Sequence, residues 1–194
     1  MAGRTNRSAK KLSAIKAQLA GKQTMLIVMQ DNPDPDALAA AAALRRIGHD
    51  LAGVQCSIAC GGTVGRAENR AMVRYLSLNL RPLDQLDVAR FDVLAMVDTQ
   101  PGTGNNSLPE GTAVQIVIDH HPMRRETRAV PVTDVRRRYG ATSSILYEYL
   151  KQAGITPDPP LATALLYGIR SDTQDLGRDA TQADVDAYEA LYPP

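Results

Sequence analysis

Short apolar runs alternate with stretches of helical spacing along most of this chain. Residues 25–29 (MLIVM) form a continuous apolar run, and residues 37–48 (ALAAAAALRRIG) form an alanine-rich helix that ends at Gly48. The same pattern predicts strands at 51–60, 92–97, 113–118 and 129–135, and helices at 65–78, 140–154, 161–169 and 181–192. Wholly apolar strands are typical of a parallel sheet that is covered on both faces. The pattern therefore predicts an α/β fold, a doubly wound, mainly parallel sheet of about five strands with helices on both faces.

The first 22 residues are rich in lysine and arginine and carry apolar residues at helical spacing. Leu12, Ile15 and Leu19 lie three and four positions apart in this segment. The spacing predicts an N-terminal basic helix over residues 1–22, followed by a single domain over residues 23–194. The helix either packs one apolar stripe against the domain or serves as an arm that binds nucleic acid, and the pattern favours the packed stripe.

Composition and charge narrow the function classes. A chain of 194 residues with 44% hydrophobic residues can bury the core of one compact unit. Its 22 basic and 21 acidic residues give a net charge of +1, which excludes an overall basic field for nucleic acid. The apolar runs are shorter than about 18 residues and the N-terminus lacks an apolar core segment, so we expect no membrane span, no signal peptide and a cytoplasmic protein.

Acidic and imidazole side chains follow three of the predicted strands. They are Asp34 and Asp36 after 25–29, Asp98 after 92–97, and Asp119, His120 and His121 after 113–118. Ligands of open α/β sheets bind beyond the carboxyl ends of the strands, so we expect these side chains to share one site. So many carboxylates in one place require protonation or divalent cations. Oxygen ligands with one or two imidazoles suit manganese or magnesium better than zinc, and the sequence predicts two such ions.

Each of these groups also has a structural interpretation. Asp36 could be the N-cap of the alanine-rich helix, and Asp98 could cap a turn before Thr99. The pair His120 and His121 could be ordinary surface or core histidines. Their conjunction at one edge of the sheet favours a site over three independent structural roles.

Five short blocks occur in an order that resembles a known family. They are NPDPDA at 32–37, VDT at 97–99, IDHH at 118–121, GATS at 140–143 and GIRSDTQDLGR at 168–178. Together they resemble the DHH phosphoesterase superfamily, which includes RecJ-type nucleases, oligoribonucleases that also act on 3′-phosphoadenosine 5′-phosphate, and inorganic and exopolyphosphatases. The resemblance covers residues 25–192 and is more specific than any one block.

The resemblance implies a metal-binding role for most of the acidic residues. Asp98 would bridge two manganese ions, with magnesium as the alternative cation. Asp34 would complete the first metal site, and the second would be completed by Asp36, His120 and Asp172. Spacing alone does not find Asp172, because it follows a predicted helix and not a strand.

Further positions are implied around these ligands. Asp119 would orient a neighbouring ligand, and His121 would contact the substrate phosphate. Thr142 and Ser143, at the start of a predicted helix, could offer N–H groups to a phosphate, although helix capping explains them as well. Arg178 is a further candidate phosphate contact, with a solvated arginine as the alternative.

The sequence departs from the family pattern in two ways. Gln30 stands where the first block of the family normally opens with histidine, so a ligand of the first metal is replaced by a neutral, less basic carboxamide. The chain also ends near the point where the family usually continues into a C-terminal domain that closes over the substrate. We therefore expect that domain to be absent from this chain, so that either the chain is the N-terminal domain of a longer protein that contains it or the natural protein works without it.

These observations predict a divalent-metal-dependent phosphoesterase for short oligoribonucleotides or 3′,5′-bisphosphate nucleotides. One alternative is a nucleotide- or phosphate-sensing domain that lost turnover together with the histidine replaced by Gln30. A further alternative is a polyphosphatase, which would use the same metals. The expected partner is a short RNA or a nucleotide, and the sequence is also compatible with a homodimer.

Overall fold

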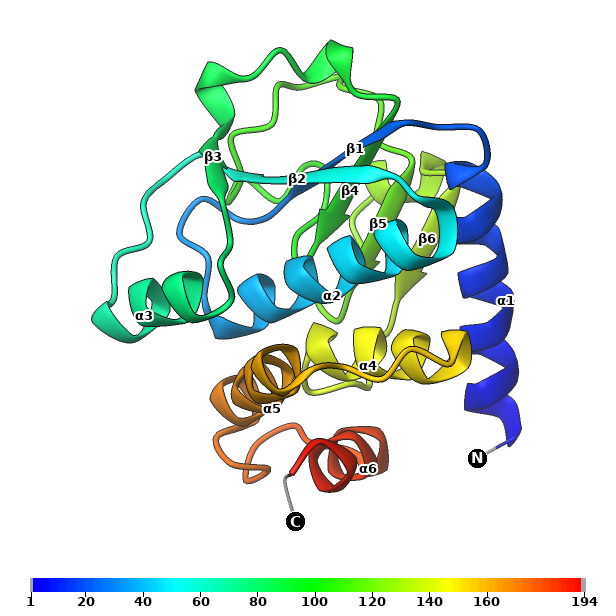
Figure 1. Cartoon of the computed structure of the whole chain (residues 1–194), viewed down its shortest axis with the longest axis vertical. Coiled ribbons are helices and arrows are strands. Elements are labelled where there is room, and N and C mark those ends of the chain that lie inside the picture. The colour runs from blue at the N-terminus through cyan, green and yellow to red at the C-terminus, as the bar shows by residue number, and fades with distance from the viewer. Residues whose placement is uncertain (1, 193–194) are drawn as a thin grey trace.

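A single parallel sheet forms the centre of the computed structural model, which describes residues 2–192 (Figure 1). Its strands are β1 (Thr24–Val28), β2 (Gln55–Cys60), β3 (Leu80–Pro82), β4 (Val93–Val97), β5 (Ile116–Asp119) and β6 (Val132–Val135). The order across the six-stranded sheet is β3-β2-β1-β4-β5-β6, and every pairing is parallel. The predicted α/β fold with its parallel sheet is confirmed, but the α-helices, which were predicted on both faces, lie on one face, and the other face has only loops and short 3-10 helices. The additional strand is β3, a short edge strand that ends in a proline and carries no strand pattern of its own.

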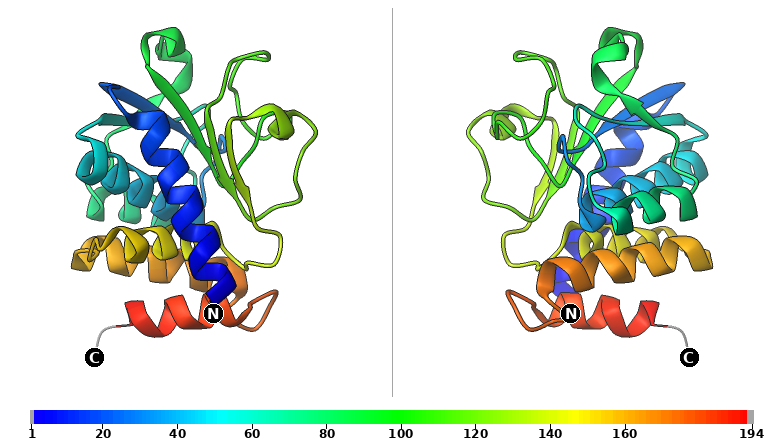
Figure 2. Two further views of the ribbon diagram at one scale, coloured as in Figure 1. Left: turned by 90° about the vertical axis from the view of Figure 1, so that its right-hand side faces the viewer. Right: turned by 90° about the vertical axis from the view of Figure 1, so that its left-hand side faces the viewer.

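The α-helices gather on one face of the sheet. They are α1 (Ala2–Leu19), α2 (Pro35–Ala52), α3 (Ala67–Tyr75), α4 (Thr142–Ala153), α5 (Pro159–Thr173) and α6 (Gln182–Leu191). All six contribute to or pack on the larger hydrophobic core. Figure 2 shows the α-helices on the side of the sheet away from the long loops. The other face is covered by loops and by the 3-10 helices η1 (Leu83–Gln85) and η2 (Val88–Arg90). Right-handed connections from β4 to β5 and from β5 to β6 must cross this second face, and they contain only loops and η3 (Glu126–Ala129).

Helix α2 lies at the centre of the larger core and is longer than predicted. It continues past Gly48 to Ala52 and ends at Gly53, which adopts a left-handed conformation with φ of 65°. The prediction that Gly48 ends this helix is wrong. A Cβ atom at Gly48 would lie 2.9 Å from Cε of Met25, so this glycine provides room for close packing against β1.

Helix α1 packs against α4 and β6 and belongs to the same core as the rest of the domain. Its predicted apolar stripe, Leu12, Ile15 and Leu19, is at most 9% exposed. The basic Lys11 donates a hydrogen bond from Nζ to the carbonyl oxygen of Thr133 at 2.6 Å. The packed-stripe interpretation of this helix therefore agrees with the structure.

A buried ionic network joins β6 to α1 and α4, and the sequence analysis did not predict it. Arg136 donates to Asp134 at 2.6 Å and to Glu148 at 2.7 Å, and the side chain of Arg136 is 2% exposed. Arg7 of α1 and Tyr149 of α4 also donate to Asp134. Although burial raises the pKa of Asp134, these donors hold it below its usual value.

No helix among residues 2–192 is both long enough and apolar enough to span a membrane.

Candidate metal centre

The predicted ligands meet where the strand order reverses, between β1 and β4. Val28 of β1 is level with Met96 of β4, and Val97 of β4 is level with Ile118 of β5, so the residues that follow these strands emerge at one edge. Two overlapping groups form there, Asp98, Asp119, His120 and His121, and Asp36, His120 and Asp172. Within each group, one ligand atom from every residue lies within 4.8 Å of the others.

Asp98 lies at the centre of this cluster and is 1% exposed. Its φ of 56° is left-handed, a conformation that aspartate tolerates better than most residues and that is typical of functional sites. One carboxylate oxygen, Oδ1, accepts a hydrogen bond from Thr142 Oγ1 at 2.9 Å, while Oδ2 is buried without a partner. Burial, together with the charges of Asp36 and Asp34, raises the pKa of Asp98 well above its usual value.

His120 is oriented by the backbone and directs its second nitrogen into the cluster. Nδ1 lies 3.2 Å from the carbonyl oxygen of Tyr139, which fixes the ring as in many metal-binding histidines. Nε2 lies 3.2 Å from Oδ2 of Asp172 and 3.5 Å from Oδ1 of Asp98, but it has no partner with hydrogen-bond geometry. Burial lowers the pKa of His120, but the carboxylates of Asp172 and Asp36 outweigh this effect and raise the pKa to about 9.

Asp36 is fully buried and joins the start of α2 to the start of α4. Its Oδ2 accepts from the N–H of Thr142 at 2.7 Å, and its Oδ1 accepts from the N–H of Ser143 at 2.8 Å. Burial and the charge of Asp172 raise the pKa of Asp36 to about 7. The suggestion that Asp36 caps α2 is wrong, because Asp34 is the N-cap of that helix.

This geometry also corrects the expectation for Thr142 and Ser143. Both residues are fully buried, and their N–H groups donate to Asp36, so these groups are not free to receive a substrate phosphate. Thr142 instead positions Asp98 through its hydroxyl group. The helix start was recognised from sequence, but its partner lies 106 residues earlier in the chain, which local spacing could not reveal.

Gln30 and Asp34 bond to each other at the edge of the cluster. Nε2 of Gln30 donates to Oδ2 of Asp34 at 3.0 Å, and Oε1 of Gln30 accepts from Asn105 at 3.3 Å. The other oxygen of Asp34 accepts from the N–H of Ala37 at 2.9 Å, which caps α2. Burial raises the pKa of Asp34. The two ligand groups found among the described residues do not include Asp34, so its role in a first metal site stays a prediction.

Asp119 holds His121 in place, as expected for a residue that orients a neighbour. Its Oδ1 accepts from the N–H of His121 at 3.1 Å and lies 2.9 Å from Nδ1 of the same residue. Although burial raises the pKa of Asp119, these contacts with His121 hold it below its usual value. The side chain of His121 is 52% exposed, so it can reach a ligand from this anchored position.

Gln100 supports Asp119 from the other side, and sequence reasoning missed it. Its Nε2 donates to Oδ2 of Asp119 at 2.6 Å, while its Oε1 accepts from the N–H of Arg124 and from the hydroxyl group of Thr127. The only available signal was its place in the polar loop over residues 100–111, directly after the block that contains Asp98.

Asp172 comes from the last turn of α5, which extends four residues beyond the predicted helix 161–169. The helix approaches the site closely because Gly168 has no side chain. A Cβ atom there would lie 2.6 Å from Oγ of Ser143 and 3.1 Å from Cα of Asp36. Arg178 donates to the backbone oxygen of Asp172 at 3.0 Å with its side chain 57% exposed, so the structure places it at the rim of the site.

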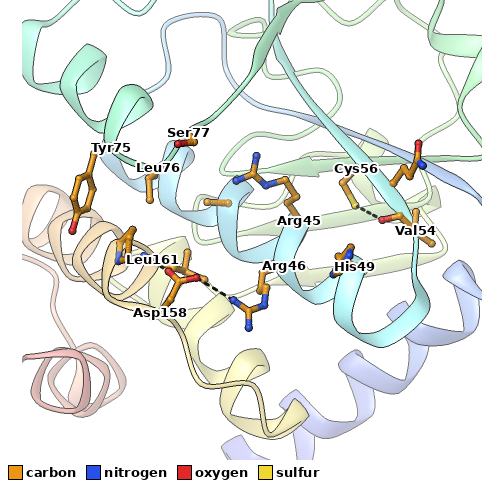
Figure 3. A pocket seen from close by; sticks show the side chains of 13 residues that line it. Arg45, Arg46, His49, Val54, Cys56, Tyr75, Leu76, Ser77, Asp158 and Leu161 are labelled. Atoms are coloured by element: carbon orange, nitrogen blue, oxygen red, sulfur yellow. Dashed lines mark hydrogen bonds and ion pairs between the residues drawn. The ribbon is translucent and has the colours of Figure 1, made fainter.

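Two cavities differ in their relation to these residues. A cavity of about 350 Å³ opens beside Asp34 and Asp172. A second, of about 540 Å³, lies between α2, β2, α3 and the start of α5 (Figure 3). Its Arg46 is already paired with Asp50 and Asp158, and none of the ligand groups of the metal centre lines it. The smaller cavity is therefore the one that adjoins the candidate chemistry.

The cluster fits divalent cations. Oδ2 of Asp98 and Nε2 of His120 are buried side-chain atoms without hydrogen-bond partners, and both point to a ligand that accepts lone pairs. The raised pKa values of Asp36 and Asp98 have the same origin, since like charges are buried together. A cation would relieve this repulsion.

We therefore expect manganese to stabilise the protein. Addition of Mn²⁺ at about a hundred times its dissociation constant should increase the free energy of unfolding by about 2.7 kcal/mol. For a domain of this size the melting temperature should rise by about 5–10 °C. Differential scanning calorimetry after dialysis against EDTA measures this shift. An unchanged melting temperature at millimolar Mn²⁺ would contradict a metal centre.

The protein is thus a parallel α/β domain with a cluster of carboxylates and imidazoles at the topological switch point between β1 and β4. The model of the DHH family, N-terminal domain, matches residues 24–169, and the chain belongs to this family. This confirms the family resemblance, and the matched residues contain the first four sequence blocks and end within the fifth, at 168–178.

Relatives of this chain are longer proteins. An uncharacterized protein of Methanocaldococcus jannaschii is 39% identical over 171 residues, which cover 88% of this chain and 34% of that protein. A probable manganese-dependent inorganic pyrophosphatase of Staphylococcus saprophyticus is 27% identical over 161 residues, which cover 82% of this chain and 52% of the relative. The chain thus spans between a third and about half of the length of these relatives.

The fold has a counterpart among solved structures. The crystal structure of an exopolyphosphatase-related protein from Bacteroides fragilis superimposes with a TM-score of 0.73, covering 94% of this chain and 56% of that one. With 11% sequence identity, this similarity shows the fold alone.

Proposed function

We propose that this protein is a divalent-metal-dependent phosphoesterase. The observation that carries the proposal is the pair of ligand groups that share His120, with the unpartnered buried atoms of Asp98 and His120 between them. The manganese dependence named for the pyrophosphatase relatives supports manganese as the cation. Cytoplasmic location and a homodimer stay predictions from sequence.

Each residue has a definite task in this proposal. Asp36, Asp98, His120 and Asp172 hold the cations, and Asp34 contributes from the N-cap of α2. Two cations held there would supply Lewis-acid polarisation of the phosphoryl oxygens and would lower the pKa of a bound water. His121, anchored by Asp119, contacts a phosphate oxygen from its exposed position, and Arg178 adds positive charge at the rim.

Two substrate classes are compatible with this centre. We propose short oligoribonucleotides or 3′,5′-bisphosphate nucleotides as the first. Inorganic pyrophosphate or polyphosphate is the second candidate, and the pyrophosphatase relatives favour it. Both classes present a phosphoryl group to the same ligands, so the comparison of substrates must be made directly.

Gln30, which stands in place of the family's histidine, supports a third possible function, the sensing of nucleotides or phosphate. The amide group of Gln30 donates to Asp34, and its oxygen accepts from Asn105. Both polar groups of Gln30 are therefore already hydrogen-bonded and are not free to bind a metal. A protein with a weak first metal position could bind nucleotides or phosphate without rapid turnover. Measured turnover separates this sensing function from the phosphoesterase function.

Hydrolysis of 3′-phosphoadenosine 5′-phosphate, a two-to-five-nucleotide RNA and pyrophosphate should therefore be measured with Mn²⁺ and Mg²⁺ for this chain and for Gln30→His. We expect metal-dependent release of phosphate or mononucleotide, and a further increase of about tenfold or more for Gln30→His, because imidazole is a better ligand than a carboxamide. Asn79→His, an exposed position outside the site, is the matched control. Absence of turnover in both proteins, with manganese bound, would support the sensing function.

A further inference from the structure

The cavity beside Asp34 and Asp172 has a second wall of different chemistry. Gly65, Arg66 and Asn69, from the start of α3, face the cavity together with Gln30 and the two acids. Because the acids belong to the metal side, a substrate bound at the metal centre has its remaining atoms within reach of the α3 wall. None of these α3 residues is a metal ligand or a phosphate contact in the proposed phosphoesterase site.

Arg66 provides an uncommitted positive charge on this wall. Its side chain is exposed and forms no hydrogen bond or ion pair with any described residue, while its backbone oxygen accepts from the N–H of Arg70 at 3.1 Å. It is also the N-cap of α3, where no side chain caps the first-turn N–H groups. A guanidinium group beside uncapped helix N–H groups matches the geometry of a phosphate or other oxyanion.

Asn69 provides a buried acceptor on the same wall. The residue is 5% exposed, and its Nδ2 donates to the carbonyl oxygen of Pro33 at 3.1 Å. This bond fixes the orientation of the carboxamide, since the reversed amide would bring two oxygens together. Oδ1 is left buried without a partner among the residues that the structure describes, although buried acceptors are nearly always satisfied. The missing partner must be a hydrogen-bond donor.

We propose that Arg66 and Asn69 form a subsite for the phosphorylated sugar of a nucleotide substrate, an inference that rests on the phosphoesterase function. Arg66 binds an anionic group of the substrate that is not hydrolysed. Asn69 accepts a hydrogen bond from a hydroxyl or amino group of the sugar or base. A polyphosphate chain offers charge for Arg66 but almost only acceptors to Asn69, so this subsite selects nucleotides over inorganic polyphosphates.

In a 3′,5′-bisphosphate substrate, Arg66 would bind the phosphate that is retained, which adenosine 5′-monophosphate still carries, and the metal centre would bind the phosphate that is released. Calorimetric binding of adenosine 5′-monophosphate and of inorganic phosphate, both with Mn²⁺, therefore tests the two positions separately and without turnover. Arg66→Ala should weaken binding of adenosine 5′-monophosphate by about tenfold, because it removes a charge-assisted hydrogen bond. Asn69→Ala should weaken it by about fivefold or more, the usual size of a single neutral hydrogen bond. Binding of phosphate, which needs only the metal centre, should change by less than about twofold in either variant. Arg74→Ala, an exposed arginine at the other end of α3, is the matched control.

Three outcomes would overturn the subsite. These are unchanged binding of adenosine 5′-monophosphate in Arg66→Ala, equal losses for nucleotide and phosphate in both variants, or no binding of the nucleotide to the unmodified protein. A different result concerns the phosphoesterase function alone. If the unmodified protein binds the nucleotide through Arg66 but hydrolyses none of the substrates, the subsite stands and the enzymatic function fails.

Discussion

Asp98→Asn is expected to reduce hydrolysis by at least about a hundredfold, since the cations at this centre supply several kcal/mol of transition-state stabilisation. The same variant should lose the rise in melting temperature with Mn²⁺. The metal-free variant should melt at a higher temperature than the metal-free unmodified protein, because the neutral carboxamide keeps the bond from Thr142 and removes the charge that repels Asp36. A higher melting temperature without metal, combined with a lost response to Mn²⁺, identifies Asp98 as a metal ligand more clearly than lost activity alone.

Calorimetry with and without Mn²⁺, combined with the hydrolysis assay, measures all three effects. Asp84→Asn is a suitable control, because Asp84 is an exposed acid of η1 outside the site. If Asp98→Asn lowers apo stability and still responds to Mn²⁺ like the unmodified protein, Asp98 has a structural role and no metal.

Arg136→Met is expected to have the largest effect on folding, a loss of about 3–5 kcal/mol in the free energy of unfolding. Methionine fills much of the space but leaves Asp134, whose side chain is 1% exposed, without its main counter-charge. Arg7 and Tyr149 still donate to Asp134, so the loss should lie near the lower end of that range. Urea unfolding at constant pH measures the change.

Arg137→Met, at the exposed neighbouring position, is the control and should change the free energy of unfolding by less than about 0.5 kcal/mol.

The loss of stability in Arg136→Met also depends on pH. The native pKa of Asp134 is lowered, so its ionic stabilisation is complete above the unfolded pKa of about 3.9 and is lost as the pH falls through the lowered native value. A loss below about 1 kcal/mol at neutral pH would contradict the importance of this network.

The sequence predicted the sheet and most of the ligand cluster for the same reason. Runs such as MLIVM are apolar throughout because both faces of a parallel strand are buried, and the acids stand at the ends of these runs, where the fold must place them at one edge. Asp172 depended on the family resemblance, because its approach to the site is made by the crossing of α5 over α2. Helix crossings have no local signal in the sequence.

The errors have local explanations. Gly48 resembles a helix end, but tertiary packing against Met25 uses its small size, and Gly53 provides the left-handed residue that ends α2. The edge strand β3 was missed because three residues ending in proline are too short for an alternation pattern. The network around Arg136 could not be found because its partners, from Ser8 to Glu148, are distant in sequence and become close only when α1 and α4 pack on β6.

The small side chains of α2 and the missing side chain of Gly168 limit how this core can vary. Ala39, Ala40 and Ala41 are fully buried, and both α4 and α5 pack against α2. Every substitution of these alanines except glycine adds volume, and added volume between α2 and α5 is expected to move Asp36 and Asp172 apart. Larger residues at these positions are therefore expected to weaken metal binding. The alanines of α2 are thus needed for cation affinity as well as for packing. A library of random variants that is selected only for folding should accept larger residues at these positions.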